Sequence, residues 1–433
     1  MTKRLLKIIL WSIIIVWIIS CDTAEPPPDD QPDPVVKSVA LSVDKFTCTE
    51  VWLSVTSENL ILPRTADIYR NDSLYRQFNL DKPDTLLYFD DLLPAREYKF
   101  VMTIPEDTIE SNTPAFRTLD TTSHNFTYQT WEFGDYSINR MLDAAIINEN
   151  DIWAVGEFYL KDSLGNSDPK PYNALHWDGN DWEAKRITVD FRGSQITPPL
   201  EGIFAFSSTD IWFSSGIPIH GDGQNWTLFH LFDMGILTQE DGSLKKIWGI
   251  SSNNLYFIGR LGTIVYYTEN NWQKIESETT EDINDIWGYS DELILGTISP
   301  SIFHQGEKMI LKISRNDVTN FDWTPQVRVA TVYFEDPYKI YAGGEGIYAY
   351  TNNKWKNIPE ITGFFISKVR GSGSNDIWAV GGSGYAAHFN GLSWKVIKEL
   401  RFSGNYLSVA VSRSRVCMVG ETSSKAVITL ISK

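Results

Sequence analysis

A repeated stretch of sequence is the feature that most constrains how this chain can fold. Residues 371–394 contain a small polar turn, a short apolar run, a glycine-rich turn, a second run that ends in His388-Phe389, and a Trp that opens a third run. Short runs separated by turn residues predict a β-meander. The pattern recurs with variations at a spacing of about 40 to 50 residues, which is typical of solenoids, propellers and other repeat arrays.

Alignment on the Trp of the last run gives seven units. The first six contain the aromatic markers Trp153, Trp212, Trp248, Trp287, Tyr341 and Trp378, and the degenerate fourth unit runs from Ile286 through Ile302 to Gly306. The seventh, from Tyr406 to Ser432, ends after its third strand. An unpaired edge strand exposes a row of backbone N–H and C=O groups. Residues 126–133, which precede the first unit and carry Trp131, are therefore expected to supply the missing fourth strand.

The sequence thus predicts an all-β chain in which residues 124–433 form a seven-bladed β-propeller closed by an N-terminal strand. The motif at residues 376–381 reads DIWAVG. It resembles the repeats of bacterial DIWAVG-type β-propellers, and the units are more loosely similar to WD40 and kelch repeats. This resemblance implies a fold and not a function.

Residues 36–120 show short alternating runs separated by turns, which favours a β-sandwich. The motif from Leu92 through Pro94 to Tyr98 resembles the tyrosine corner of fibronectin type III domains. The resemblance implies that the Tyr98 hydroxyl bonds back to the main chain. Alternation places Val55 where that family has its core Trp and puts Trp52 on the opposite face. Trp52 is therefore either a contact for the neighbouring domain or a solvent-facing aromatic.

The N-terminus has the character of a targeting segment. Residues 1–20 combine a basic start with an apolar run that is shorter than the ~20 residues of a membrane span, which predicts a signal peptide. Residues 18–21 resemble a bacterial lipobox, which implies lipidation of Cys21. Residues 21–35 are rich in Pro and acids and predict an extended tether. We expect a lipid anchor in the outer membrane of the cell envelope and exposure at the surface, although Asp22 alone would favour inner-membrane retention.

Composition excludes some classes of function. The formal net charge is −17, so the surface repels phosphate backbones and nucleic-acid binding is not expected. The three cysteines are far apart in the chain and predict no disulfide framework. No nucleophile elbow, metalloprotease motif, P-loop or paired CxxC is present.

Two polar patterns could suggest metal sites. His176, His220, His304 and His388 recur near the turn before the last strand, but each belongs to a separate blade, so we interpret them as stabilising their blades. Residues 162–168 are rich in oxygen donors, yet they lack EF-hand spacing and a closing Glu, which favours a solvated turn over a Ca²⁺ site. We expect no metal and no cofactor.

The candidate binding residues come from loops between strands two and three and between blades, because these loops are irregular and share one face of the ring. Aromatic and Arg side chains are the usual anchors of recognition. They are Tyr136, Phe191, Arg192, Arg260, Trp323, Phe364, Arg401 and Phe402. We predict a non-catalytic recognition module for a glycan or for an envelope or extracellular protein. The alternatives are a scaffold subunit of an envelope complex and a propeller hydrolase that acts on glycans.

Overall fold

The computed structural model describes residues 36–433 with the exception of residues 301–305 and 362. The predicted signal peptide (1–20), the predicted tether (21–35) with the expected lipidation site Cys21, and His304 lie outside the described residues. Nearly all regular structure is β-strand; the short 3-10 turns are η1 (Pro105–Asp107), η2 (Arg260–Gly262), η3 (Gly382–Gly384) and η4 (Lys398–Leu400). Within the described ranges, no helix has the length and apolar character needed to cross a membrane.

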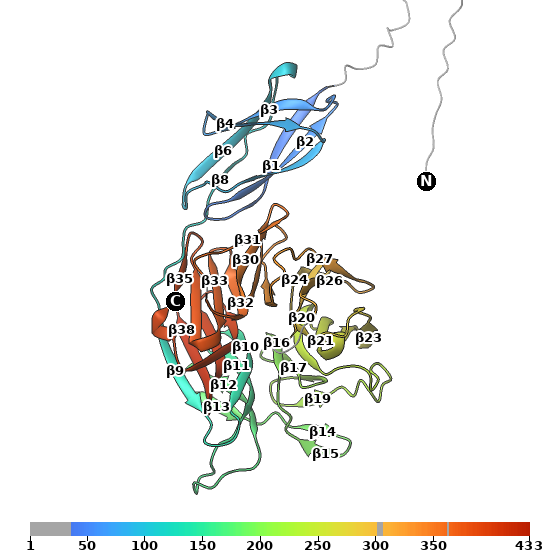
Figure 1. Cartoon of the computed structure of the whole chain (residues 1–433), viewed down its shortest axis with the longest axis vertical. Coiled ribbons are helices and arrows are strands. Elements are labelled where there is room, and N and C mark those ends of the chain that lie inside the picture. Colours follow the sequence, from blue (N-terminus) through green and yellow to red (C-terminus); the bar gives the residue numbers. More distant parts are fainter. Residues whose placement is uncertain (1–35, 301–305, 362) are drawn as a thin grey trace, which may run out of the picture.

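The first part of the chain forms two packed sheets, which Figure 1 shows beside the larger remainder. One sheet has the order β1 (Ser38–Phe46), β2 (Val51–Glu58), β5 (Asp84–Phe89). The other has the order β4 (Ser73–Leu80), β3 (Arg64–Arg70), β6 (Glu97–Ile104), β7 (Ile109–Glu110), with β8 (Ala115–Arg117) also paired to β6. Leu53 and Val55 of one sheet and Ile68, Phe100 and Met102 of the other are buried in one core. We call this part the sandwich.

The corner that precedes β6 has the hydrogen bond expected from its sequence. The Tyr98 hydroxyl accepts a bond of 2.9 Å from the backbone N–H of Leu93, five residues earlier. The hydroxyl of Thr118 donates to the carbonyl of Leu93 at 2.6 Å, so the same corner is tied to the end of the domain. Both bonds satisfy polar groups that lie next to the core.

The rest of the described chain forms seven four-stranded antiparallel sheets. In chain order they are β10 (Arg140–Asn148), β11 (Asp151–Phe158), β12 (Tyr172–Trp177), β13 (Trp182–Lys185); β16 (Gly202–Ser207), β17 (Asp210–Ser214), β18 (Pro218–Gly221), β19 (Trp226–Leu228); β20 (Leu244–Ser251), β21 (Asn254–Gly259), β22 (Ile264–Thr268), β23 (Asn271–Ile275); β24 (Ile283–Ser290), β25 (Leu293–Ile298), β26 (Met309–Ile313), β27 (Val318–Phe321); β28 (Val329–Tyr333), β29 (Ile340–Gly344), β30 (Gly346–Thr351), β31 (Lys354–Asn357); β32 (Ile366–Gly373), β33 (Asp376–Gly381), β34 (Tyr385–Phe389), β35 (Trp394–Val396); and β36 (Gly404–Val411), β37 (Arg415–Thr422), β38 (Ala426–Ser432), β9 (Thr127–Phe133). A hairpin of β14 (Val189–Phe191) and β15 (Ser194–Ile196) joins the first two sheets.

The sheets form a closed ring. The first strand of each sheet packs against the first strand of the next, and β36 packs against β10. β9 comes from the N-terminal side of the ring and pairs with β38 along its whole length, from Phe133 opposite Ala426 to Thr127 opposite Ser432. The strand predicted at residues 126–133 therefore completes the last sheet, and no edge remains open at this junction.

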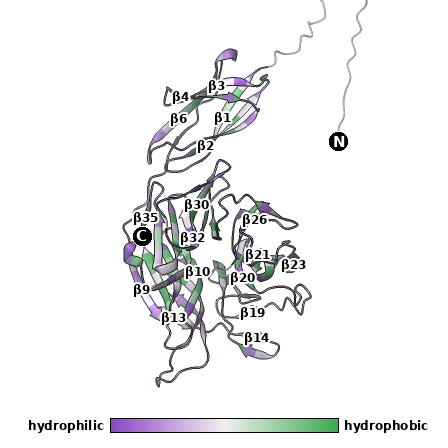
Figure 2. Ribbon diagram, viewed as in Figure 1, coloured by the Kyte–Doolittle hydropathy of each residue, from purple (hydrophilic) through white to green (hydrophobic). Residues whose placement is uncertain are grey.

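Apolar side chains hold adjacent sheets together. One cluster joins Met141, Ile152 and Leu175 of the first sheet to Val419 and Ile428 of the last. Similar clusters lie between the third and fourth sheets and between the fifth and sixth. Figure 2 shows hydrophobic residues along the strands of the ring. The ring is thus stabilised by burial of apolar surface between neighbouring sheets.

The fourth sheet differs from its predicted boundaries. Its third strand is β26 (Met309–Ile313) and not the segment that ends at Gly306. The apolar run of β26 pairs with β25, and the turn at residues 314–317 then leads into β27. Residues 314–326 are therefore mostly turn and strand rather than one long loop, which changes the environment of Trp323.

The ring has two faces. Turns within each sheet, between its first and second and between its third and fourth strands, lie on the turn face, which includes residues 334–339, 374–375 and 390–393. The connections between second and third strands and between sheets lie on the loop face, which includes residues 260–263, 365, 382–384 and 397–403. The sandwich contacts the turn face at residues 334–339 of the fifth sheet.

The joint between sandwich and ring is packed and charged. Trp52 is 2% exposed, and its ring lies 5.5 Å from that of Tyr338 in the ring domain. The Lys339 ammonium donates to both carboxylate oxygens of Glu50 at 2.8 Å. Lys45 pairs with Asp336 at 2.9 Å. Of the two interpretations of Trp52, the structure supports the contact with the neighbouring domain.

We expect Trp52→Ala to loosen this joint, because truncation of a buried Trp costs about 3–5 kcal/mol. Limited proteolysis should then cleave residues 121–126, between the two domains, faster than in the parent chain. Leu74→Ala, at a side chain 59% exposed on the sandwich, is the matched control and should leave the rate unchanged. Equal cleavage of the parent and Trp52→Ala would show that the indole does not hold the domains together.

Candidate functional site

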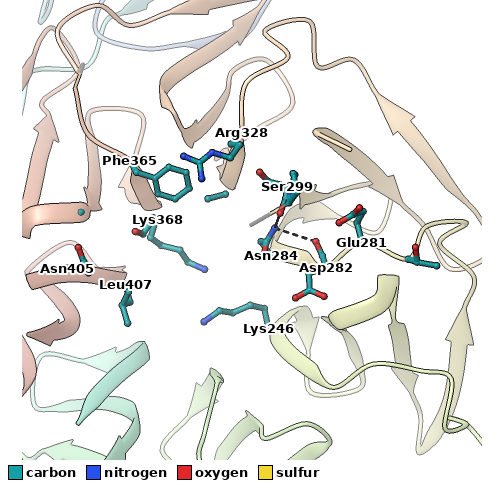
Figure 3. A pocket seen from close by; sticks show the side chains of 15 residues that line it. Lys246, Glu281, Asp282, Asn284, Ser299, Arg328, Phe365, Lys368, Asn405 and Leu407 are labelled. Carbon is teal, nitrogen blue, oxygen red and sulfur yellow. Dashed lines mark hydrogen bonds between the residues drawn. The ribbon is translucent and has the colours of Figure 1, made fainter. Parts of the chain in front are cut away.

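A cavity of about 840 Å³ opens on the loop face, at the centre of the ring. Its lining comes from the beginnings of the first strands and from the adjoining connections. In Figure 3, Lys246 and Lys368 reach into the open space, and Arg328 and Phe365 lie on the opposite side from Glu281 and Asp282. A narrower cavity of about 190 Å³ is lined by residues deeper in the ring and shares Lys246 and Lys368 with the first.

The charged residues at the centre occupy one repeated position. They lie nine residues before the second residue of the second strand: Asp143 before Ile152, Lys246 before Leu255, Asp285 before Ile294, and Lys368 before Ile377. In each case a register irregularity in the first strand comes directly before the charged residue. Such bulges redirect side chains. Here they accompany charged groups on strands that also contribute side chains to the apolar clusters.

Asp285 is the anchor of the larger ion-pair network. It is 1% exposed and receives bonds from Lys368 at 2.6 Å and from Arg370 at 2.7 and 3.0 Å. The hydroxyl of Thr331 donates to it at 2.6 Å. Burial alone would raise the pKa of Asp285, but the positive charges of Arg370 and Lys368 outweigh it and hold that pKa well below its usual range.

A second pair lies across the ring. Lys246 donates to Asp143 at 2.8 Å and to the carbonyl oxygens of Leu142 and Glu201 at 3.2 and 2.9 Å. Ser408 donates to Asp143 at 2.6 Å. Burial opposes ionisation of Asp143, yet Lys246 and then Lys368 hold its pKa below the ordinary value. Each of the three N–H groups of the Lys246 ammonium therefore has an acceptor inside the protein.

Two of the predicted binding residues come together at the rim of the loop face. The Arg401 guanidinium lies 4.6 Å from the centre of the Phe364 ring, which stacks on Tyr385 at 4.8 Å. Phe364 lines a cleft of about 300 Å³ that shares Arg328 and Phe365 with the central cavity. Phe402 packs instead against Tyr406, with ring centres 4.9 Å apart.

The other predicted residues are not part of this cluster. Arg260 is exposed on the loop face, next to Leu261, whose N–H donates to the cavity residue Asp282 at 3.3 Å. Phe191 and Arg192 lie on the outer hairpin, where Arg192 pairs with Asp233 at 2.6 Å.

Tyr136 is half-buried and donates its hydroxyl to the carbonyl of Asp168. Trp323 is only 4% exposed; it packs against Trp355 and donates to the carbonyl of Val327. Its indole belongs to the core of the fourth and fifth sheets and offers no exposed ring, because the fourth sheet extends further along the chain than predicted.

The lining residues themselves were missed by the sequence reasoning. The predicted residues lie mostly in loops, whereas Lys246, Asp285 and Lys368 lie inside strands. The available signal was a charged residue at a fixed position of the first strand in four of the seven units, the first, third, fourth and sixth. Buried charges require partners, so charges of both signs at one repeated position indicate a shared network.

The recurring histidines stabilise their own sheets. His176 bonds to Asp151 at 2.9 Å, His220 to Asp210 at 2.9 Å and His388 to Asp376 at 3.1 Å. Each ring also stacks on the Trp of its second strand, at 4.4, 4.1 and 4.6 Å respectively. In the part of the chain that the structure describes, no group of three His, Cys, Asp or Glu is placed to hold a metal ion.

The oxygen-rich loop at residues 162–168 is closed by its own hydrogen bonds. Asp162 accepts from the backbone N–H groups of Leu164 and Asn166 at 2.9 and 2.8 Å. Asp168 pairs with Arg186 at 2.6 Å. These carboxylates already have protein partners, as expected of a solvated turn.

A histidine pair lies beside the joint on the turn face. Nδ1 of His124 is 2.9 Å from Nδ1 of His388. When His388 is neutral and its Nε2–H donates to Asp376, its Nδ1 accepts and His124 donates from Nδ1. Nε2 of His124 is then buried with no hydrogen-bond partner among the described residues. Burial, followed by the influence of His388 and Lys395, lowers the pKa of His124 to about 4.

This low pKa predicts a pH dependence. The unfolded chain binds a proton at His124 below about pH 6.5, whereas the folded chain does so only near pH 4, so stability contributed by the neutral ring is lost as pH falls between these values. Urea unfolding at pH 7 and pH 5 should therefore show a smaller difference for His124→Gln than for the parent. An unchanged difference would mean that His124 titrates normally in the folded protein.

No known protein family matches the sequence, and no curated protein matches it. Among solved structures, the chain is similar to YCF48 bound to a D1 peptide, with a TM-score of 0.53 and 14% identity over 72% of this chain and 99% of that chain. It is also similar to the WD40 domain of Neurospora crassa Pan2 (TM-score 0.46, 10% identity, 67% and 89% covered) and to Saccharomyces cerevisiae Sqt1 (0.43, 9%, 69% and 97%). At these identities the likeness concerns the fold alone: the ring is a β-propeller.

Proposed function

We propose that this protein is a lipid-anchored recognition module of the cell envelope, whose seven-bladed propeller binds a segment of a partner protein in the loop-face cavity. The sandwich, with its tyrosine corner, is a fibronectin type III-like spacer in this proposal. The observation that carries it is a cavity of about 840 Å³ that opens on the face of the ring opposite the sandwich. A cavity of this size is typical of ligand sites that combine apolar walls with a few polar groups.

The lining favours a polypeptide. Phe365 and Leu407 supply apolar surface, while Lys368 and Arg328 on one side and Glu281 and Asp282 on the other supply both signs of charge. An extended peptide carries apolar groups, charges of both signs and backbone hydrogen-bonding groups in a small volume. YCF48, which is similar in fold, was solved with a bound peptide. That structure supports the choice of a protein segment over a glycan.

The position of the sandwich gives the cavity its orientation. The sandwich rests on the turn face, where Glu50 and Trp52 contact Lys339 and Tyr338. The proposed anchor at Cys21 precedes the sandwich in the chain. An anchored protein would therefore present the opposite face, with its cavity, toward partners away from the point of attachment.

The two alternatives are less well supported. A glycan hydrolase of the usual kind needs two carboxyl groups that flank the scissile bond. Among the described lining residues, Glu281 and Asp282 are adjacent on one wall, and Asp282 pairs with Lys245 at 3.1 Å. A scaffold would need a flat apolar contact surface rather than a polar cavity.

The proposal is tested with the full-length chain in mild detergent, used to capture binders from solubilised envelopes. Leu407→Trp should block the cavity and abolish retention, because Leu407 lines it. Ile250→Trp places the same ring on the turn face, at a side chain 49% exposed, and should retain the partner. Protease treatment of the envelope fraction should remove the binder, whereas periodate oxidation of glycans should not. Equal retention by both variants would refute the site.

A further inference from the structure

The central network of the ring carries one positive charge more than it can pair internally. Lys246 is matched with Asp143, and Arg370 holds both oxygens of Asp285. Lys368 shares Asp285 with Arg370, so its charge has no carboxylate of its own. A buried charge without a full partner is costly to maintain. The position of this charge at the floor of a cavity indicates a role other than stabilising the fold.

The Lys368 ammonium also has unused hydrogen-bond donors. Its side chain is 7% exposed, and Asp285 is its one acceptor among the described residues, although an ammonium carries three N–H groups. Lys246, on the other side of the cavity, has three acceptors, one for each N–H group of its ammonium. The two lysines in Figure 3 therefore differ: Lys246 is internal structure, and Lys368 is open toward the cavity.

Arg328 extends this donor set toward the mouth of the cavity. Its Nε donates to Glu345 at 2.7 Å, and its guanidinium lies 4.9 Å from the centre of the Phe365 ring. Neither Nη group donates a hydrogen bond to the described residues. A guanidinium that is held in place by an ion pair and an aromatic ring is well prepared to bind a carboxylate.

We propose, building on the function above, that the cavity recognises a carboxylate of its protein partner, which Lys368 binds at the floor and Arg328 binds nearer the mouth. Glu281 and Asp282, on the other side, disfavour an anion there and so fix the orientation of the bound segment. Burial and the charge of Arg370 lower the pKa of Lys368 to about 8, and a bound carboxylate would supply the negative charge that stabilises the ammonium. The carboxylate comes from an acidic side chain or from a chain terminus.

The test uses the full-length chain in mild detergent on arrays of random decapeptides, prepared once with a free C-terminal carboxylate and once with a C-terminal amide. We expect binders enriched in Asp and Glu in both formats if a side chain is recognised, or binders confined to the free format if the terminus is. Lys368→Met should weaken the best binder about 10- to 100-fold, the range for loss of a charge-assisted hydrogen bond. Lys368→Arg should restore most of the affinity.

The controls separate this inference from the proposed function. Lys354→Met removes the same charge from an exposed position on the turn face and should bind like the parent. Peptides that bind without any preference for carboxylates, and that Leu407→Trp still blocks, would overturn the carboxylate site and leave the proposed function standing. Absence of any peptide binder would overturn both.

Discussion

Asp285→Ala is expected to lower the free energy of unfolding of the ring by about 3–5 kcal/mol, because it leaves Lys368 and Arg370 buried without their shared carboxylate. The carboxylate also accepts from Thr331 and from the N–H of Val332, so the substitution leaves further buried donors unpaired. Urea unfolding followed by tryptophan fluorescence measures the change, since most of the tryptophans lie in the ring.

Asp282→Ala is the matched control for this prediction. It removes a carboxylate only three residues away, whose partner Lys245 remains in contact with water. Exposed ion pairs contribute about 0–1 kcal/mol. Similar stabilities for the two variants would show that the central network contributes little to folding.

A disulfide between Thr130→Cys and Thr429→Cys is expected to stabilise the ring strongly. These residues are direct partners in the pairing of β9 with β38, and their hydroxyl groups lie 2.9 Å apart. The bond would join the two ends of the ring and close a loop of roughly 300 residues, for which loop-closure entropy predicts several kcal/mol of stabilisation. The effect is the difference in melting temperature between the oxidised and the reduced form of the double-cysteine variant. Both forms lack the Thr429 hydroxyl, so its loss does not contribute to the difference.

Single-cysteine Thr429→Cys should show no such dependence on oxidation. If the double variant oxidises slowly or melts at the same temperature in both states, β9 does not stay paired with β38 in solution. The ring would then close in another way, or it would remain open.

The repeat pattern was sufficient to predict most of the sheets and the strand that closes the last one. Short apolar runs and fixed turns located five of the four-stranded units, and the incomplete seventh unit required a strand from residues 126–133. The resemblance of residues 92–98 to a tyrosine corner predicted the Tyr98 hydrogen bond. The sheets and the closing strand follow instead from alternation and from the need to pair every edge, which can be read from a single sequence.

The degenerate fourth unit marks where this reasoning fails. Without a clear Trp at its end, its third strand was placed too early, and Trp323 was assigned to a surface loop although it is buried. An aromatic residue close to turn residues fits both a loop anchor and a core position. The choice depends on strand register, which a weak repeat does not fix.

The central site could not be predicted from loops, because its residues are far apart in the chain. Asp285 meets Lys368 and Arg370 only when the fourth and sixth units are brought to one axis. The predicted residues Phe364 and Arg401 lie at the rim of the face on which the cavity opens. The residues at the floor of the cavity were not predicted. A comparison of the same position in every first strand would have found the charged residues.

The most direct test of the account is site-specific photo-crosslinking in living cells. A benzophenone side chain replaces Phe365, an aromatic residue that lines the cavity, or Ile250 on the turn face. We predict that the Phe365 position yields a crosslinked protein partner of defined mass and that the Ile250 position does not. Adducts formed only from Ile250, or from neither position, would contradict the claim that a partner protein enters the loop-face cavity.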